Sequence, residues 1–174
     1  VPLGEAATVR AGTDLTVGLL PTSRWLCATF STRDGLEHLP NIPTEEVFTT
    51  PDWRRAEGTV RTTMPLVVPG IGIRVDGLAF TLREWRIVEV TAEGDGAAII
   101  EGALAKDEQA RFLGELALVT GDSAVKRTGL IFHDTLFDEN ATCHIAYGSG
   151  LPFAVDGAEG LDRDGLLGAG INVS

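Results

Sequence analysis

Residues 137–148 gather several side chains that can bind metals or carry out catalysis: Asp138, Glu139, Asn140, Cys143 and His144. Imidazole and carboxylate groups are ligands for Zn²⁺ and related divalent ions, so this segment is a candidate metal site. Taken alone, the same residues also fit a turn at 138–140 followed by a histidine whose polar atoms are satisfied in the core. The segment therefore indicates metal binding only in combination with others.

A second candidate is the glutamate pair Glu45 and Glu46, which follows an Asn-Ile-Pro turn at 41–43. β-Branched and aromatic residues come directly afterwards at 47–50, so a strand is expected there. This order puts Glu46 near the start of a strand, where its side chain can point into a cleft. Two solvated glutamates at a strand edge are the alternative, and composition alone favours them.

Glu115 is the third candidate, because it precedes the apolar run at residues 116–119. A carboxylate inside a buried strand needs a partner or a metal ion. A carboxylate exposed at a helix end, just before the strand begins, explains the same pattern equally well.

Other kinds of catalytic site lack their sequence motifs. The chain has no phosphate-binding G-x-x-x-x-G-K-[ST] loop, no G-x-S-x-G nucleophile elbow and no H-E-x-x-H zinc helix. Gly70 and Gly72 are followed by strand-like residues, not by the helix of a dinucleotide site. Cys143 and His144 are neighbours on an expected strand, so they point to opposite faces and make a doubtful nucleophile–base pair.

The elements expected to position these residues are mostly strands. Alternating or apolar runs predict strands at 13–20, 25–30, 71–75, 78–82, 88–90 and 116–119. Helical spacing is found from Asp95 to about Leu113, with Asp107 starting a second segment. Residues 151–174 are glycine-rich and read as loop. We therefore predict a single α+β domain, mostly β, with a mixed sheet and one or two short helices.

Composition excludes several classes of protein. The chain has 174 residues, 44% of them apolar, which is enough for one domain with a hydrophobic core. Its net charge of −11 argues against nucleic-acid binding and against docking on anionic membranes. No apolar run is long enough to span a bilayer.

Two isolated cysteines, Cys27 and Cys143, favour a reduced, cytoplasmic protein. The start at Val1 suggests a shortened or processed chain.

The three candidate segments, taken in order, resemble the thermophilic metalloaminopeptidase family (the aminopeptidase T, aminopeptidase S and PepS type). They are E-E-V-F-T-T-P at 45–51, L-G-E-L-A-L-V at 113–119 and T-L-F-D-E-N-A-T-C-H-I-A-Y-G at 135–148. The resemblance covers nearly the whole chain, although family members are longer. It implies that residues 1–174 are one truncated C-terminal catalytic domain, without the family's N-terminal domain.

The resemblance also implies roles for individual residues. Glu46, Glu139 and His144 match metal-associated positions, and Glu115 matches a metal ligand or catalytic acid–base. Intact members are expected to remove N-terminal residues from peptides as homodimers. They are expected to use two divalent ions that share a water or hydroxide, Zn²⁺ or Co²⁺ with Mg²⁺ or Mn²⁺ as alternatives.

Two departures from the family pattern limit what is expected of this chain. Some members have a catalytic tyrosine where this sequence has Leu151, and Tyr147 does not match that position. The family also continues with a His-x-Asp ligand pair beyond the position of Ser174, and neither His38 nor His133 belongs to such a pair. We therefore expect at most one metal ion in this chain and little or no activity from it alone. A structural or dimerisation module without catalysis is the main alternative, and an unrelated β-rich binding module is another.

Overall fold

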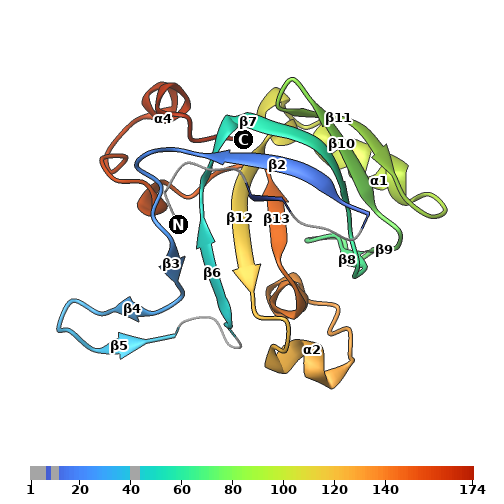
Figure 1. The fold of residues 1–174 in the computed structure, drawn as a ribbon, viewed down its shortest axis with the longest axis horizontal. Coiled ribbons are helices and arrows are strands. Elements are labelled where there is room, and N and C mark those ends of the chain that lie inside the picture. Colours follow the sequence, from blue (N-terminus) through green and yellow to red (C-terminus); the bar gives the residue numbers. More distant parts are fainter. Residues whose placement is uncertain (1–6, 9–11, 40–43) are drawn as a thin grey trace.

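Two antiparallel sheets form the framework of the computed structural model, which describes residues 7–8, 12–39 and 44–174. In the described part of the chain, the larger sheet has the strand order β1-β2-β7-β10-β11 (Figure 1). Its strands are β1 (Ala7–Thr8), β2 (Asp14–Leu19), β7 (Pro51–Arg61), β10 (Ala79–Arg83) and β11 (Arg86–Thr91).

The second sheet carries the candidate site residues and has the order β13-β12-β6-β3. Its strands are β3 (Leu26–Cys27), β6 (Glu46–Thr49), β12 (Leu113–Val119) and β13 (His144–Tyr147). Only Thr50 separates β6 from β7, so nearly continuous chain passes from one sheet into the other. Two small ribbons are added by β4 (Phe30–Ser31) with β5 (Glu37–His38) and by β8 (Leu66–Val67) with β9 (Arg74–Val75).

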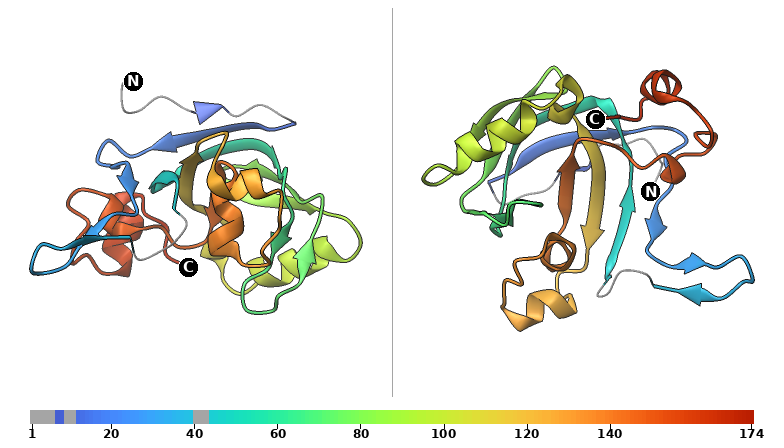
Figure 2. Two further views of the ribbon diagram at one scale, coloured as in Figure 1. Left: turned by 90° about the horizontal axis from the view of Figure 1, so that it is seen from below. Right: turned by 180° about the vertical axis from the view of Figure 1, so that it is seen from behind.

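The helices are short and lie outside the sheets. Figure 2 shows α1 beside β11 at one end of the molecule and α4 at the other. The helices are α1 (Gly96–Leu104), α2 (Ala124–Thr128), α3 (Thr135–Asp138) and α4 (Arg163–Ala169), with 3₁₀ turns η1 (Glu108–Arg111), η2 (Glu139–Ala141) and η3 (Pro152–Ala154). No helix in the described residues is long and apolar enough to cross a membrane.

The core lies between the two sheets and α1. Leu82, Ile87, Ile100 and Leu113 are fully buried in it, and Leu116 adds a side chain from the sheet of the candidate site. Burying such side chains is the main force that holds the sheets together.

Most of the predicted elements are confirmed, including the mostly β, α+β class. The predicted mixed sheet is wrong, because every strand pairing in the described residues is antiparallel. β2, β10, β11 and β12 form where alternation predicted strands. Asp107 begins η1 as expected, with its carboxylate accepting bonds from the backbone N–H groups of Gln109 and Ala110. Asp95 stands at the start of α1, but its side chain makes no capping bond. The turn expected at 41–43 lies outside the described residues.

The strand predicted at 71–75 is wrong for most of its length. Gly70 and Gly72 have φ angles of +80° and +66°, so a turn occupies this region, and only Arg74 and Val75 pair as a strand. Ile71 is 58% exposed, so the alternation there does not mark a buried face. The run at 25–30 is likewise split between β3 and β4.

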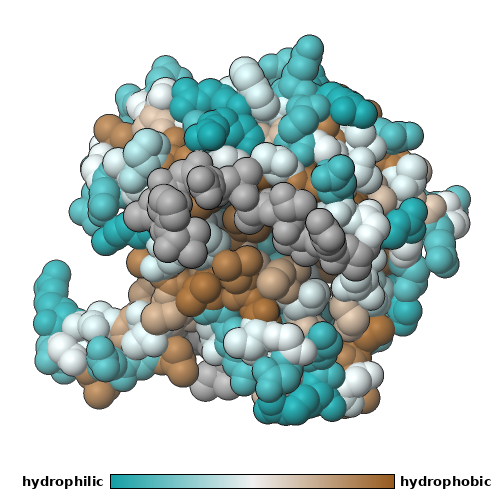
Figure 3. All heavy atoms as spheres, in the orientation of Figure 1, coloured by the Kyte–Doolittle hydropathy of each residue, from teal (hydrophilic) through white to brown (hydrophobic). Residues whose placement is uncertain are grey.

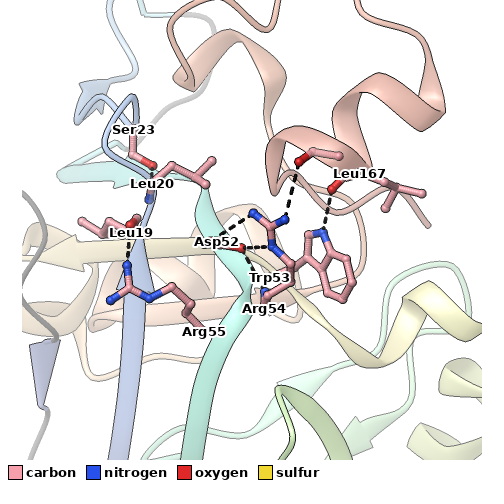
Figure 4. Close-up of polar contacts among 9 residues, drawn as sticks. Leu19, Leu20, Ser23, Asp52, Trp53, Arg54, Arg55 and Leu167 are labelled. Atoms are coloured by element: carbon pink, nitrogen blue, oxygen red, sulfur yellow. Dashed lines mark hydrogen bonds and ion pairs between the residues drawn. The ribbon is translucent and has the colours of Figure 1, made fainter.

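The tail predicted as loop contains α4 and is anchored to β7. Trp53 Nε1 donates to the Leu167 carbonyl at 3.3 Å, and Arg54 donates to the Gly168 carbonyl at 3.5 Å (Figure 4). An ion pair with Asp52, 2.9 Å from Arg54 Nε, holds the guanidinium in place. Three glycines within and just after α4 obscure its helical pattern in the sequence, so tertiary contacts decide it.

Candidate metal centre

Three of the four candidate residues lie on strands of the same sheet and on the same face of it. Strand β12 is central: Ala117 pairs with Phe48 on β6 and with His144 on β13. Val119 pairs with Glu46, and Glu115 pairs with Ala146. Because side chains alternate along a strand, Glu46, Glu115 and His144 all project from the face that carries Ala117.

Glu46 and His144 meet across Ala117. His144 Nε2 lies 3.2 Å from Glu46 Oε2, and the two side chains are only 15% and 7% exposed. Ala117 is fully buried between their strands, and its single methyl group leaves room for the longer side chains to converge. The small residue on the central strand thus creates the site.

Glu139 reaches the same place from η2, and Asn140 fixes that turn. The buried Asn140 side chain accepts a bond from the Glu45 N–H at 2.9 Å and donates to the Leu136 carbonyl at 3.1 Å. These bonds tie the turn that carries Glu139 to the residue directly before Glu46. Glu45 itself has a structural role, because its carboxylate accepts a bond from the Ala124 N–H at the start of α2.

One nitrogen of His144 is committed to the backbone. Nδ1 lies 3.2 Å from the Thr142 carbonyl oxygen, which can only accept, so Nδ1 carries a proton. Nε2 is then the nitrogen left to face Glu46. A backbone carbonyl that fixes one imidazole nitrogen and frees the other is the usual arrangement for a metal-binding histidine.

The donor atoms of Glu46, Glu139 and His144 all lie within 4.8 Å of one another. Glu46 Oε2 is buried and makes no hydrogen bond of good geometry among the described residues. Its nearest partner is His144 Nε2 at 3.2 Å, so without a metal ion this buried carboxylate depends on a protonated imidazole to compensate its charge. Two carboxylates and one imidazole form a donor set that suits Zn²⁺ and similar divalent ions. These three residues therefore fit a metal ion.

The model of the thermophilic metalloprotease (M29) family matches residues 5–174. The chain belongs to this metalloprotease family. Aminopeptidase PepS of Streptococcus thermophilus is 41% identical over 163 residues, and aminopeptidase T of Thermus aquaticus is 48% identical over 137 residues. Among solved structures, wild-type AmpT from Thermus thermophilus superposes with a TM-score of 0.85 at 41% identity.

The match covers only part of each M29 relative. The alignment with PepS takes in 94% of this chain but 39% of PepS, and that with aminopeptidase T takes in 79% and 33%. The AmpT superposition covers 94% of this chain and 39% of the AmpT chain. The resemblance to this family, predicted from the three sequence motifs, is thus confirmed for a segment that corresponds to 33–39% of these relatives.

Burial and repulsion between neighbouring carboxylates alter the protonation of the candidate cluster. Burial raises the pKa of Glu139 to about 7, and the charges of Glu46, Glu115 and Asp134 add to it, while His144 opposes the rise. Burial also raises the pKa of Glu115. Burial by itself would lower the pKa of His144, but the neighbouring Glu46 carboxylate and the Thr142 carbonyl raise it overall. Without a cation, the cluster therefore retains protons near neutral pH.

Glu115 lies near the cluster but outside the group of three donors. It shares their face of the sheet, and its pKa responds to the charges of His144 and Glu46. Its carboxylate is not among the atoms that lie within 4.8 Å of one another. The prediction that Glu115 is a metal ligand or a catalytic acid–base remains a prediction.

The sequence did not indicate the role of Ala117 or the positioning role of Asn140, and it raised a cysteine, Cys143, that does not join the cluster. Ala117 gives no chemical signal in the sequence, and Asn140 was interpreted as part of a turn. A small residue in the middle of an otherwise bulky apolar strand is the one available hint for Ala117. Cys143 is a free thiol whose sulfur lies 3.4 Å from the Val119 backbone nitrogen, so it is directed at the β12 backbone.

Proposed function

We propose that this chain forms the metal-binding part of an aminopeptidase, an enzyme that removes N-terminal residues from peptides. The observation that carries the proposal is the cluster of Glu46, Glu139 and His144. It occurs in a chain of the M29 family whose named relatives are aminopeptidases. We further propose that residues 1–174 are one catalytic domain acting in the cytoplasm, in line with the free thiols of Cys27 and Cys143.

In this proposal Glu46, Glu139 and His144 hold a divalent ion, Zn²⁺ or Co²⁺. A bound ion of this kind polarises a peptide carbonyl and makes water more acidic near neutral pH. Glu115 is assigned the proton transfer, because it is a carboxylate with a raised pKa on the same face of the sheet. A general base of this kind takes a proton from the attacking water and returns it to the leaving nitrogen.

Among the described residues, the clustered donors suffice for one ion. In residues 7–8, 12–39 and 44–174 the structure places one group of three donors together. The described residues therefore offer no second group of donors for the second ion expected from the family resemblance. We propose that this chain alone turns over peptides slowly or not at all.

A chimeric enzyme tests the proposal directly. Residues 5–174 would replace the superposed segment of Thermus thermophilus AmpT, which shares 41% identity with this chain. We expect the chimera to cleave a leucyl-nitroanilide but not its N-acetylated form, since an aminopeptidase requires the free amine. Substituting Glu46→Gln or His144→Ala should abolish cleavage together with metal binding, and Glu115→Gln should abolish cleavage alone. A folded chimera that cleaves neither compound, or both equally, would refute the proposal.

A structural role without catalysis is the second candidate, and the hairpin of β4 and β5 favours it. This hairpin extends from the body of the protein (Figure 3) and carries exposed apolar side chains, with Leu36 65% and Leu39 48% exposed. Exposed apolar side chains of this kind are typical of protein–protein contacts. We propose that the hairpin contributes to a homodimer. Light scattering should then give a dimer for the chain and a monomer for the double variant Leu36→Ser, Leu39→Ser.

A further inference from the structure

A cavity of about 490 Å³ lies between the two sheets. Leu15 lines it from β2 of the larger sheet, and Leu116 and Leu118 line it from β12 of the other. Leu116 and Leu118 flank Ala117 on their strand, so they project from the face opposite to that of the metal cluster. Of the three clustered donors, only His144 borders the cavity. The cavity therefore lies behind the cluster and is a different site.

Several polar groups along the cavity walls are already bonded within the protein. Thr13 Oγ1 accepts a bond from the Arg61 N–H at 3.1 Å and lies 3.4 Å from the carbonyl oxygen of the same residue. Cys143 Sγ contacts the backbone of β12. Apolar side chains such as Val60 and Met64 make up much of the remaining lining. A ligand rich in amide groups would leave many of them unpaired here, so these walls favour a hydrocarbon.

The charge at the cavity is opposite in sign to that of the whole chain. The chain has 25 acidic and 14 basic residues, yet none of the described lining residues is acidic, and Arg61 and Lys126 both line the cavity. Both side chains are exposed, which places their charged ends at the opening. Figure 3 shows hydrophilic surface over α2, which carries Lys126, and apolar surface over β12 beside it.

These two cations lack acidic partners in the part of the chain that the structure describes. Neither Arg61 nor Lys126 forms an ion pair with a described residue. In a chain with a net charge of −11, two unpaired cations beside an apolar cavity complement a ligand that has an anionic end and an apolar body.

We propose that this cavity binds an acyl carboxylate. The hydrocarbon chain lies between the sheets, and the carboxylate meets Arg61 and Lys126 at the opening. The volume of about 490 Å³ is in the usual range for small-molecule sites. Binding requires neither a metal ion nor catalysis, so the proposal is tested on metal-free protein and its failure leaves the proposed function untouched.

Calorimetric titration of the metal-free chain with decanoate, decanol and decyltrimethylammonium separates the contribution of charge from that of the apolar chain. We expect decanoate to bind about tenfold more tightly than decanol, and decyltrimethylammonium not to bind, because only the carboxylate is attracted by the two cations. Octanoate should bind roughly tenfold more weakly than decanoate, since it buries two fewer methylene groups.

Variants of the charged residues test the opening of the cavity. Arg61→Gln and Lys126→Gln should each weaken decanoate binding by roughly two- to fivefold and leave decanol binding unchanged. Arg86→Gln and Lys106→Gln are the matched controls, because both residues are exposed and neither lines the cavity. The two controls should bind decanoate like the unmodified protein.

A variant of the apolar wall tests where the hydrocarbon lies. Leu118→Glu adds a negative charge to the wall and should abolish decanoate binding. Val88→Glu is its control, because Val88 is also an exposed apolar strand residue but lies outside the cavity. Thermal unfolding of both variants confirms that they are folded.

Three results would overturn the proposal. The first is no binding of decanoate to the unmodified protein, and the second is equal binding of decanoate and decanol. The third is binding of acetyl-Leu-Leu, which has a free carboxylate and two amide groups, as tightly as decanoate. The cavity would then receive the carboxyl end of a peptide instead of an acyl chain.

Discussion

Glu46 Oε2 and His144 Nε2 lie 3.2 Å apart, although their strands, β6 and β13, are not paired with each other. The strand between them, β12, presents only the methyl group of Ala117 at the crossing point. A larger residue there would push the two donors apart. The geometry of the site is therefore a property of the sheet as well as of the donors themselves.

The substitution Ala117→Val tests this relationship. We expect it to weaken Co²⁺ binding by roughly 10- to 100-fold, as is usual when a residue that orients a ligand is changed. The added methyl groups should also lower the free energy of unfolding by about 1–3 kcal/mol. Calorimetric titration with Co²⁺ and urea unfolding measure the two effects.

Ala56→Val is the matched control, because Ala56 is an equally buried alanine in β7 of the other sheet. It should reduce stability by a similar amount and leave Co²⁺ affinity unchanged. Equal losses of affinity in the two variants would mean that Ala117 acts only through general stability.

Asn140 is expected to position Glu139 without binding metal itself. Asn140→Ala removes the bonds to the Glu45 N–H and the Leu136 carbonyl, both of them part-buried, at a cost of about 1 kcal/mol or more. The turn that carries Glu139 should then loosen, and Co²⁺ affinity should fall by roughly 10-fold or more.

Asn172→Ala provides the comparison for Asn140→Ala. Asn172 is also a buried asparagine, and its Nδ2 donates to the carbonyls of Gln109 and Gly148. Its loss should destabilise the protein to a similar extent without affecting Co²⁺ binding. An Asn140→Ala protein that binds Co²⁺ normally would exclude the positioning role.

Metal affinity should rise with pH. Glu139, with a pKa of about 7, and His144, with a raised pKa, must both lose protons to bind an ion. We expect Co²⁺ affinity to increase by roughly tenfold or more between about pH 6 and about pH 8. The dependence should become shallower in Glu139→Gln, and equal affinity at the two pH values would contradict this explanation.

The stability of the metal-free protein should change in the opposite direction. Folded Glu139 keeps its proton up to about pH 7, whereas the unfolded chain releases it near the ordinary value of 4.5. The folded state therefore binds more protons between these values, and stability falls as the pH rises. The raised pKa of His144 acts in the same sense, since the stability it adds is lost as pH rises through that pKa. Thermal unfolding with and without Co²⁺ should show a larger metal effect at about pH 8 than at about pH 6.

Local patterns in the sequence predicted much of the fold. Alternation located β2, β10 and β11, because each buries one face against the core. The same pattern at residues 71–75 was misleading, since two glycines with positive φ make a turn there. Helix α4 was missed because its glycine content hides a segment that is held by contacts with the distant Trp53 and Arg54.

The candidate site was predicted only in part, because its assembly also depends on contacts between segments that are distant in the sequence. The residue types made Glu46, Glu139 and His144 candidates, and the family resemblance implied their association with metal. Which of them converge depends on strand register and on the turn fixed by Asn140, and neither can be read from one sequence. Ala117 contributes only by being small, so its role is not evident from the sequence even though it lies within the motif at 113–119.

The central claim is that Glu46, Glu139 and His144 bind one divalent ion, and metal stoichiometry tests it most directly. The chain would be loaded with Zn²⁺ or Co²⁺, dialysed and measured by elemental analysis, beside His144→Ala and the control His38→Ala, whose histidine is exposed on β5. We predict about one ion per chain for the unmodified protein and the control, and none retained by His144→Ala. The same metal content in all three proteins, or no metal in any of them, would contradict the assignment.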